Sequence, residues 1–379
     1  MSNMSRREFV KTTALSASAV ALSAGVSRGF PANEKVRLGW IGSGHRGKQL
    51  LNALKASGAN AEVAVLCDLI QDRINEGTAI VAPDKPTGYN DFRVMLDKEK
   101  LDGIVIATPP NAHAEVAVPV LNAGFNTFCE KPVDITVAKC DAVTKAARAS
   151  KGIFQIGTQR RCAPIYRKMM EAIWAGMHGK TMMMQGGWHW SQDPSRHKPD
   201  RDGGRLIEQA SHHMDVMSWA MKDVAPVRCV AMGYSYKGAK PSEFSETESF
   251  TTFEFPGGVL FNYSHLWLLP GKFDEEVLRC YGEKGCMDFN KSVYIGRDEK
   301  EQRFGEPIAK EWNLGTDEEM AHFVDCIKTG NRTPWANIET GRICSLMCIM
   351  GRMAMVNAKK DVYEPSVVTW KDLGSTTDL

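Results

Sequence analysis

The sequence predicts a two-domain α/β protein, with an open parallel sheet in the N-terminal half and a strand-rich C-terminal half. Three observations support this fold class. Apolar runs alternate regularly with helical periodicities over residues 34–157, which is typical of βα units. Over residues 158–379 a helix-led opening gives way to long β-type runs. The chain of 379 residues is also too long for one ordinary hydrophobic core.

The N-terminal domain is organised around residues 36–47, VRLGWIGSGHRG. An apolar run leads into Gly42-Ser43-Gly44-His45-Arg46-Gly47, and helical periodicity follows. In such a strand, turn and helix, the first glycine permits the turn, the second lets a pyrophosphate approach, and the third lets helix pack on strand. Phosphates then meet unpaired N–H groups of the helix. This predicts a Rossmann domain whose cofactor contacts Gly42, Gly44, His45, Arg46 and Gly47.

One acidic residue indicates which dinucleotide is bound. A second β-type run, residues 62–67, ends at Asp68, about twenty residues beyond the last glycine. A carboxylate there accepts hydrogen bonds from both ribose hydroxyls of NAD and repels the 2′-phosphate of NADP. We therefore expect NAD rather than NADP. The alternative is that Asp68 only caps the following helix.

Polar side chains gather at the ends of two further predicted strands. Residues 101–107 are followed by Thr108-Pro109-Pro110-Asn111-Ala112-His113, and residues 125–129 by Glu130-Lys131-Pro132. Ligands of an open parallel sheet lie beyond the carboxyl ends of its strands, so both segments should face the glycine turn across one crevice. The residues predicted to contact the cofactor there are Thr108, Pro109, Asn111, His113, Glu130 and Lys131.

Lys131 is the candidate for proton transfer. A lysine at a strand end, beside a positively charged nicotinamide, can lose its proton more readily and act on a substrate hydroxyl. The alternative is a surface ion pair between Glu130 and Lys131.

Residues 1–33 are predicted to be a signal and linker rather than part of the fold. Paired arginines, Arg6 and Arg7, precede an apolar run of small residues from 12 to 26. This pattern is typical of a twin-arginine signal, so we expect a periplasmic or secreted protein. That route exports folded proteins, which would suit a tightly held NAD. The alternative is a basic tail followed by an amphipathic helix.

Composition argues against several classes of protein. The chain has 47 basic and 45 acidic residues, and the signal removes more basic than acidic ones, so the rest is nearly neutral. Nothing indicates a nucleic-acid footprint, and no apolar run beyond the signal is long enough to span a bilayer. The ten cysteines are scattered without metal-like spacing, which favours buried thiols over disulfides.

The second half carries a candidate catalytic helix, residues 206–219. Helical spacing places Glu208, His212 and Asp215 along one face. A carboxylate-flanked imidazole is how a general acid or base is oriented. His213 points elsewhere, and a structural role is the favoured interpretation. A metal site is the alternative, although no HExxH motif occurs. Its ligands would be Glu208 and His212 with His189, His197 or His213.

Together these motifs resemble the Gfo/Idh/MocA oxidoreductases, the family of glucose–fructose oxidoreductase, inositol dehydrogenase and rhizopine-catabolism proteins. The resemblance covers residues 36 to about 370 and rests on GSGHRG, Asp68, ATPPNAH, CEKP, GTQRR and EQASHHMD in this order. It implies a C-terminal domain with a large, mostly antiparallel sheet. One face of that sheet covers the active site, and the other often makes oligomer contacts, so we expect a homo-oligomer, a dimer or tetramer.

The resemblance also implies the reaction: NAD-dependent hydride transfer from a CH–OH group of a sugar, polyol or glycoside. The family's catalytic lysine, usually followed by a cis proline, corresponds to Lys131. The family's Asp-x-x-x-His helix with a further aspartate matches His212 and Asp215, while Glu208 replaces the first aspartate. We therefore expect Lys131, His212, Glu208 and Asp215 to be catalytic.

Substrate contacts are expected from the segment after the last βα unit and from an aromatic strand. Gln159 and Arg160 belong to GTQRR, Trp188 lies in the run 181–190, and His213 follows His212. Aromatic rings in this region can stack on a sugar face, although core packing or an oligomer interface is as good an explanation. The aromatic candidates are Trp188, Trp190, His265 and Trp267.

Two other functions stay open. Some relatives are glycosidases that keep NAD bound and recycle it through oxidation, elimination and reduction. The second is a secreted, non-catalytic binding protein that retains the fold.

Overall fold

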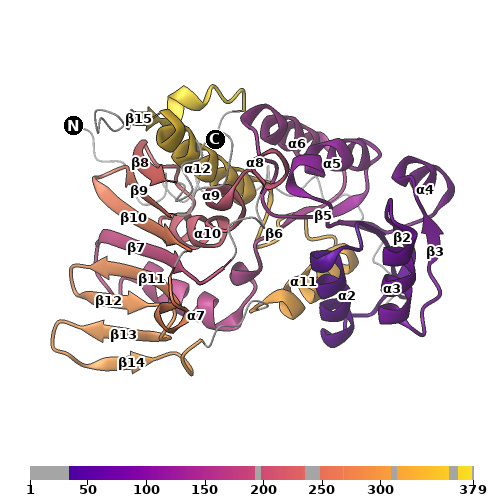
Figure 1. The fold of residues 1–379 in the computed structure, drawn as a ribbon. Helices are drawn as coiled ribbons and strands as arrows, with labels where there is room; N and C mark the ends of the chain where they lie inside the picture. The colour runs from indigo at the N-terminus through magenta and orange to yellow at the C-terminus, as the bar shows by residue number, and fades with distance from the viewer. Residues whose placement is uncertain are drawn as a thin grey trace, which may run out of the picture.

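The structure is a computed structural model that describes residues 34–377 apart from 193–197, 235–247, 268, 309–313 and 358–365. The predicted twin-arginine signal, residues 1–33, lies outside the described residues. The described chain forms two sheets, one in each half of the molecule (Figure 1).

The N-terminal sheet is parallel, with the strand order β3-β2-β1-β4-β5-β6. Its strands are β1 Val36–Ile41, β2 Ala61–Cys67, β3 Thr87–Tyr89, β4 Gly103–Ile106, β5 Asn126–Glu130 and β6 Phe154–Gly157. Its helices are α2 His45–Ala56, α3 Gln71–Val81, α4 Phe92–Lys98, α5 His113–Asn122 and α6 Val137–Ala149. The predicted Rossmann domain is confirmed. Its strand order reverses between β1 and β4, which is where such sheets bind ligands.

The central strands are buried on both faces because helices cover both sides of a parallel sheet. Every residue of β4 is buried, and Arg37 alone is exposed in β1. The helices contribute one apolar stripe each, as α2 does with Leu50, Leu51 and Leu54. This rigid sheet fixes the positions of the loops at its carboxyl edge.

The C-terminal sheet has the order β14-β13-β12-β11-β7-β10-β9-β8-β15. Its strands are β7 Thr181–His189, β8 Arg228–Tyr234, β9 Glu248–Phe255, β10 Val259–Leu266, β11 Glu275–Gly282, β12 Gly285–Asp288, β13 Val293–Gly296, β14 Glu301–Arg303 and β15 Ser366–Thr369. Its β7 and β10 pair in parallel, whereas its other described strand pairs are antiparallel. The expectation of a large, mostly antiparallel sheet is confirmed.

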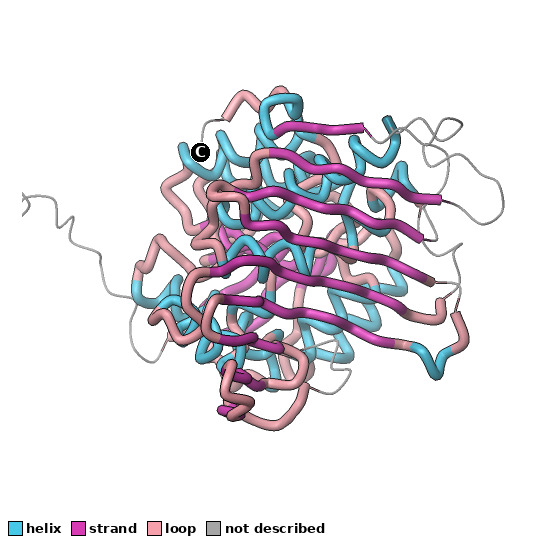
Figure 2. Tube along the Cα trace, turned by 90° about the vertical axis from the view of Figure 1, so that its left-hand side faces the viewer, coloured by secondary structure: helices cyan, strands magenta, loops and turns pink. Residues whose placement is uncertain are grey.

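Helices cover one face of this sheet and leave the other open. The helices of this half are α7 Pro164–Trp174, α8 Pro199–Asp202, α9 Arg205–Glu208, α10 Ser211–Ala220, α11 Thr316–Thr329 and α12 Ile338–Asn357. Side chains such as Phe253 and Phe261 point to the covered face and are fully buried. Figure 2 looks onto the opposite, outer face, over which no described helix lies. The exposed apolar residues of the outer face are Met183, Met232, Tyr234, Phe250, Leu260, Leu266 and Val367.

Helix α11 packs against the N-terminal sheet although it lies late in the chain. Figure 1 shows α11 beside α2. Phe323 of α11 contacts Phe128 of β5 with ring centroids 5.8 Å apart, and Met320 joins the same buried cluster as Trp40. The core of the dinucleotide-binding domain therefore draws on residues outside 34–157.

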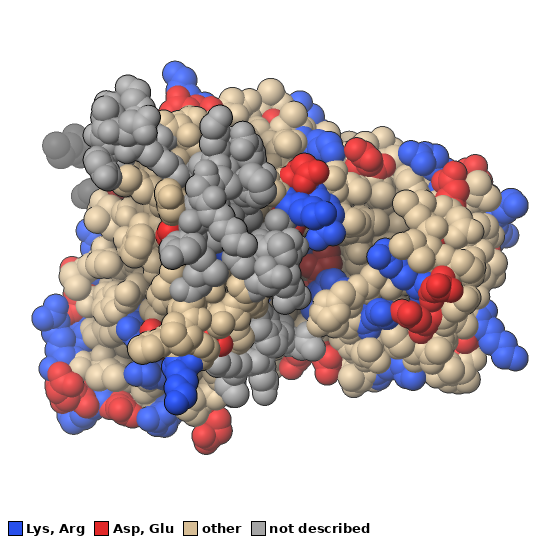
Figure 3. All heavy atoms as spheres, viewed as in Figure 1, with Lys and Arg blue, Asp and Glu red and all other residues tan. Residues whose placement is uncertain are grey.

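The described surface shows mixed charge and no membrane helix. Lys and Arg side chains are interspersed with Asp and Glu over the N-terminal domain, at the right of Figure 3. Within the described residues, every helix is too short or too polar to cross a bilayer. All ten cysteines are unpaired and, apart from the partly exposed Cys286, buried, which confirms the prediction of buried thiols.

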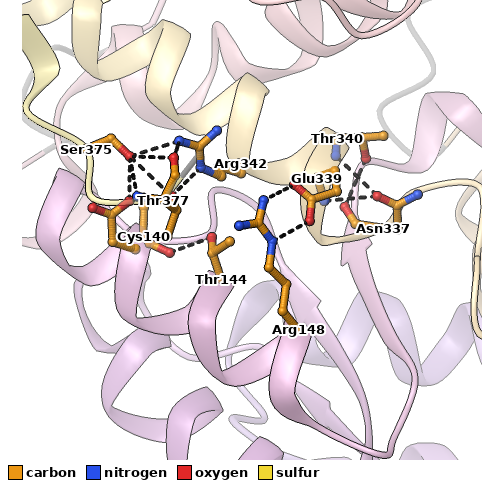
Figure 4. Close-up of polar contacts among 10 residues, drawn as sticks. Cys140, Thr144, Arg148, Asn337, Glu339, Thr340, Arg342, Ser375 and Thr377 are labelled. Atoms are coloured by element: carbon orange, nitrogen blue, oxygen red, sulfur yellow. Dashed lines mark hydrogen bonds and ion pairs between the residues drawn. The ribbon is translucent and has the colours of Figure 1, made fainter. Parts of the chain in front are cut away.

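The end of the described chain is tied to both α6 and α12. Asp141 of α6 accepts hydrogen bonds from Ser375 Oγ at 2.7 Å, Thr376 N at 2.6 Å and Thr377 Oγ1 at 2.8 Å. Arg342 of α12, fully buried, donates from Nε to Thr377 Oγ1 at 2.6 Å (Figure 4). Burial alone would raise the pKa of Asp141, but these hydrogen bonds lower it below its usual value. The tail thus joins a helix of each domain.

We expect Asp141→Ala to lower the free energy of unfolding by about 2 kcal/mol, because several hydrogen bonds to one carboxylate are lost. A lower midpoint of thermal unfolding measures this. The control is Glu339→Gln, which breaks the exposed ion pair with Arg148, 2.7 Å long, and should cost less than about 1 kcal/mol. Equal effects of the two substitutions would contradict the conclusion that the hydrogen bonds to Asp141 tie the end of the chain to the fold.

Candidate active site

A cavity of about 590 Å³ lies at the carboxyl edge of the Rossmann sheet, between the two domains. One wall comes from the loops after β1, β4 and β5, and the other from the second half of the chain. Its lining residues are His45, Arg46, Gln49, Ala107, Thr108, Pro110, His113, Glu130, Lys131, Gln159, Trp188, Gln192, Glu208, Gln209 and His212. The predicted crevice is therefore present, and both domains contribute side chains to it.

The three glycines of the turn have different structural roles. Gly42 has φ +94°, and a Cβ there would lie 2.6 Å from the Ala107 carbonyl oxygen. A Cβ on Gly47 would overlap the Gly42 carbonyl oxygen. At Gly44, among described residues other than its chain neighbours, the only atom within 4.0 Å of such a Cβ is Arg73 Nη1, at that limit. The fold itself requires Gly42 and Gly47, whereas the space beside Gly44 is left open for a ligand.

The surroundings of this turn fit a dinucleotide. Within the described part of the chain, no side chain caps the N-terminus of α2, which leaves its first N–H groups and its dipole for a phosphate. The buried hydroxyls of Ser43 and Thr108 have no hydrogen-bond partner within the described chain. Orphaned donors and an uncapped helix, next to space at Gly44, are what a bound pyrophosphate requires.

Asp68 ties the end of β2 to the glycine turn. Its carboxylate accepts hydrogen bonds from Ser43 N at 2.8 Å and from Ile70 N at 3.0 Å, and Arg73 Nη1 lies 3.6 Å away. Helix α3 begins three residues later, with Ile70 as its N-cap. Asp68 does not line the cavity, but it lies against the turn on which a bound NAD would rest.

His113 and Asn111 hold the loop after β4. The ring of His113 is fully buried and lies 2.7 Å from the Pro132 carbonyl oxygen at Nδ1 and 3.0 Å from the Thr108 carbonyl oxygen at Nε2. Burial lowers the pKa of His113 despite these two contacts. Asn111 donates to the Asp200 carbonyl oxygen of α8 and does not line the cavity. His113 thus connects the predicted cofactor loop to the segment that carries Lys131.

Lys131 lies at the junction of the two domains. It precedes Pro132 through a cis peptide bond, as the resemblance implied. Its Nζ donates to the Glu208 carbonyl oxygen at 2.8 Å and to Glu208 Oε1 at 3.0 Å. The surface pair with Glu130 is therefore not formed, because Glu130 instead accepts from Arg46 Nε at 2.6 Å.

The predicted single helix over residues 206–219 is wrong. Helix α9 ends at Glu208 and α10 begins at Ser211. The Glu208 carbonyl oxygen accepts from Ser211 Oγ at 2.7 Å and from Lys131 Nζ, while the His212 amide turns to the Gln209 carbonyl oxygen instead. Hydrogen bonds from side chains thus replace the helical ladder at this point.

The break also separates the three residues that were predicted to share a face. Glu208 and His212 line the cavity, but Asp215 is buried beneath it and pairs with Arg161 Nε at 2.8 Å. Burial raises the pKa of Asp215 to about 6, against the opposing effect of Arg161. The expectation that Asp215 orients the His212 imidazole is therefore wrong for this geometry, because its described partner is an arginine of the core.

His212 is positioned as a neutral imidazole at the cavity wall. Burial, followed by the nearby charges of Lys131, Arg160 and Arg46, lowers its pKa well below the usual value. The His212 ring lies 5.9 Å, centroid to centroid, from that of Trp188. A neutral imidazole at pH 7 can accept a proton from a substrate hydroxyl.

The predicted substrate contacts divide into lining and buried residues. Gln159 and Trp188 line the cavity. Arg160 is instead paired with Glu276 beneath it, and His213 is fully buried with Nε2 3.4 Å from the same carboxylate. The structural interpretation of His213 is therefore supported. Arg160, which was predicted to contact substrate, does not line the cavity, because its guanidinium pairs with Glu276.

Several lining residues had not been predicted. Gln49, Gln192 and Gln209 offer amides to the cavity. Gln49 lies one helical turn after His45, whose ring it contacts at 3.1 Å, so the helical spacing of α2 could have indicated it. No local pattern marks Gln192 or Gln209, because their position depends on how the two domains meet.

We expect Gly44→Ala to leave the fold intact and weaken NADH binding by roughly tenfold or more, because the methyl group occupies the space of the pyrophosphate. Fluorescence titration with NADH measures the affinity, and thermal unfolding checks the fold. Gly47→Ala is the contrasting variant and should lower the unfolding midpoint. Unchanged NADH affinity in Gly44→Ala would contradict the conclusion that Gly44 leaves space for the cofactor while Gly47 is required by the fold.

Comparison with known sequences finds matches to one protein family in both domains. Residues 36–158 match the Gfo/Idh/MocA family, described as an oxidoreductase family with an NAD-binding Rossmann fold, and residues 166–288 match the C-terminal domain of that family. Inositol 2-dehydrogenase of Salmonella typhimurium is 30% identical over 192 residues, 50% of this chain and 55% of the relative. Rhizopine catabolism protein MocA of Rhizobium meliloti is 27% identical over 58% of this chain and 62% of its own. The chain thus spans little more than half the length of these relatives.

Solved structures share the fold over nearly the whole chain. The myo-inositol 2-dehydrogenase of Lactobacillus plantarum gives a TM-score of 0.71 at 18% identity, covering 89% of this chain and 99% of that one. A levoglucosan dehydrogenase in complex with NADH and levoglucosan gives 0.75 at 17% identity, with the same coverage. Motifs, sheet order and both domain matches agree, and this chain belongs to the Gfo/Idh/MocA oxidoreductase family.

Proposed function

We propose that this protein is an NAD-dependent oxidoreductase that oxidises a CH–OH group of a sugar or polyol. The observation that carries the proposal is the arrangement of Lys131, Glu208 and His212 around one cavity beside the dinucleotide turn. The family membership and the inositol dehydrogenase relatives support this reaction class.

Lys131, Glu208 and His212 have different roles in removing the proton from the substrate hydroxyl. Bound NAD would supply the hydride acceptor. Lys131 holds the substrate hydroxyl through its Nζ, which Glu208 orients with both its carbonyl and its carboxylate. The neutral His212 then accepts the hydroxyl proton at its ring nitrogen. Glu208, which replaces the family's first aspartate, thus pairs with the lysine.

The cavity wall suits a polyhydroxylated ligand. Trp188 offers an aromatic ring, on which the apolar face of a sugar can stack. Gln159, Gln192 and Gln209 offer amide donors and acceptors for hydroxyl groups. These side chains support a sugar or polyol substrate.

Lys131→Met should lower kcat by about a hundredfold or more, since the hydroxyl loses its positioned partner, while NADH affinity stays near that of the parent protein. Steady-state kinetics and NADH titration separate the two quantities. The matched control is Lys168→Met on the exposed side of α7, which should change neither. Loss of NADH binding in Lys131→Met would place the lysine in cofactor binding instead.

The reaction itself is tested on protein purified without added cofactor. Mass analysis of the denatured protein identifies any retained nucleotide, and NADH absorbance after addition of myo-inositol or neutral sugars measures oxidation. NADH formation supports the proposal. Release of an aglycone from glycosides without net NADH would support the NAD-recycling glycosidase. The absence of both reactions would overturn the proposal that the protein is an enzyme.

We further propose that the outer face of the C-terminal sheet joins two copies of the chain. Its apolar residues occur in two pairs on the same side of the sheet, because strand pairing sets Met183 beside Leu260 and Phe250 beside Met232. An exposed apolar face of this kind favours a self-complementary contact.

The double substitution Phe250→Glu and Leu260→Glu should convert an oligomer into a smaller species, because it places charges in the contact. Sedimentation velocity measures the mass. Val94→Glu on α4, away from this face, is the control and should leave the mass unchanged. A parent protein that sediments as a monomer would overturn the proposal.

Export through the twin-arginine route is a further proposal, supported by Arg6, Arg7 and the apolar run after them. Replacing both arginines with lysine should retain the protein in the cytoplasm, and fractionation of cells that express the full chain measures this. Equal export of both forms would contradict the proposal.

A further inference from the structure

A buried carboxyl group of α11 lies directly behind the cavity. The side chain of Glu319 is fully buried, and neither of its oxygens has a hydrogen-bond partner in the described part of the protein. Its nearest described cation is Arg46, whose Nη2 lies 3.8 Å from Glu319 Oε2. Arg46 lines the cavity, so one side chain separates Glu319 from the ligand space.

Arg46 is already engaged by other groups. Its Nε donates to Glu130 Oε1 at 2.6 Å, and its Nη2 donates to Gln159 Oε1 at 3.2 Å. Two buried carboxyl groups therefore face one guanidinium, and Glu130 makes the shorter contact. Lys131 does not compensate, because it pairs with Glu208.

The other charged groups that affect Glu319 are acidic. Arg46 of α2 favours its ionised form, whereas Glu130 of β5 and Asp215 of α10 oppose it. The Gln155 amide of β6 donates to the Glu319 main-chain oxygen and leaves the carboxyl group without a donor. On α11 itself, Asp317 and Glu318 are exposed, and His322 lies one turn further on. Burial, followed by Glu130, raises the pKa of Glu319 well above its usual value.

We propose that Glu319 is a proton-binding residue that sets the relative affinity of the site for oxidised and reduced cofactor. It holds a proton when the cavity is empty or contains neutral NADH. The positive nicotinamide of NAD⁺, bound in the cavity that Arg46 and Glu130 line, would favour the carboxylate, and the proton would leave to solvent. This inference rests on the proposed NAD-dependent oxidation.

The proton balance of turnover follows from this exchange. Oxidation converts R₂CHOH and NAD⁺ into R₂C=O, NADH and one proton. The nicotinamide loses its charge in that step, so Glu319 takes up one proton as NADH forms. The enzyme therefore retains one proton until NADH leaves and the next NAD⁺ binds. Glu319 acts through the field at the cavity and does not touch the substrate.

Calorimetric titration in buffers of different ionisation enthalpy counts the protons released when nucleotide-free protein binds NAD⁺ or NADH. The parent protein should release up to one proton with NAD⁺ and none with NADH. Accordingly, the dissociation constant of NAD⁺ should fall by up to about tenfold for each unit by which the pH rises, while the dissociation constant of NADH stays level. Glu319→Gln, which resembles the protonated residue, should abolish both effects, and exposed Glu318→Gln should preserve them.

The ligand-free protein provides a second measurement. A carboxyl group whose pKa is raised by folding binds more protons in the folded state, so stability falls as pH rises from the unfolded value, about 4.3, toward the folded value. Glu319→Gln should remove that contribution from the pH profile of the unfolding midpoint.

The outcomes separate this inference from the proposed function. Equal proton release with NAD⁺ and NADH, or release that persists in Glu319→Gln, would overturn the role of Glu319 and leave the enzyme assignment intact. Protein that binds neither nucleotide would overturn both.

Discussion

The contact between Lys131 and Glu208 is the interaction on which the site depends. It joins the end of a Rossmann strand to the last residue of α9 and therefore sets how the two domains meet at the cavity. The lysine binds a main-chain oxygen as well as a carboxylate, so its position is fixed by backbone and side chain together. A break between α9 and α10 makes that carbonyl oxygen available. The irregular helix is therefore part of the site.

The sequence alone predicts the parts of the site that local chemistry determines. The glycine turn, Asp68 and Lys131 all follow buried parallel strands, and such strands align their carboxyl ends at one edge. Their position therefore follows from the order of elements. The large C-terminal sheet was expected from family resemblance, because its composition indicates strands but not their order.

The errors arose where tertiary contacts override local periodicity. Helical spacing placed Asp215 beside His212, but a lysine from the other domain interrupts the helix, and Arg161 binds Asp215 in the core. Arg160 was expected to contact substrate as part of GTQRR, yet it pairs with Glu276 of β11 beneath the cavity. Glu319 had no marker in the sequence, since its importance depends on the packing of α11 against the N-terminal sheet.

The buried charges around the cavity occur in layers with different functions. Arg161 with Asp215, and Arg160 with Glu276, are compensated pairs below the cavity, and they hold its floor in place. Arg161 also binds Asp223, so both of its carboxylates are hydrogen-bonded to it. Arg46 differs because it is hydrogen-bonded to Glu130, while Glu319 lies 3.8 Å from it. An opposite charge in direct contact favours the ionised form of a carboxyl group, whereas a buried carboxyl group without such a contact responds to any charge that enters nearby. Oxidised nicotinamide carries such a charge and reduced nicotinamide does not. The burial that makes α11 part of the core therefore also makes Glu319 sensitive to the oxidation state of the cofactor.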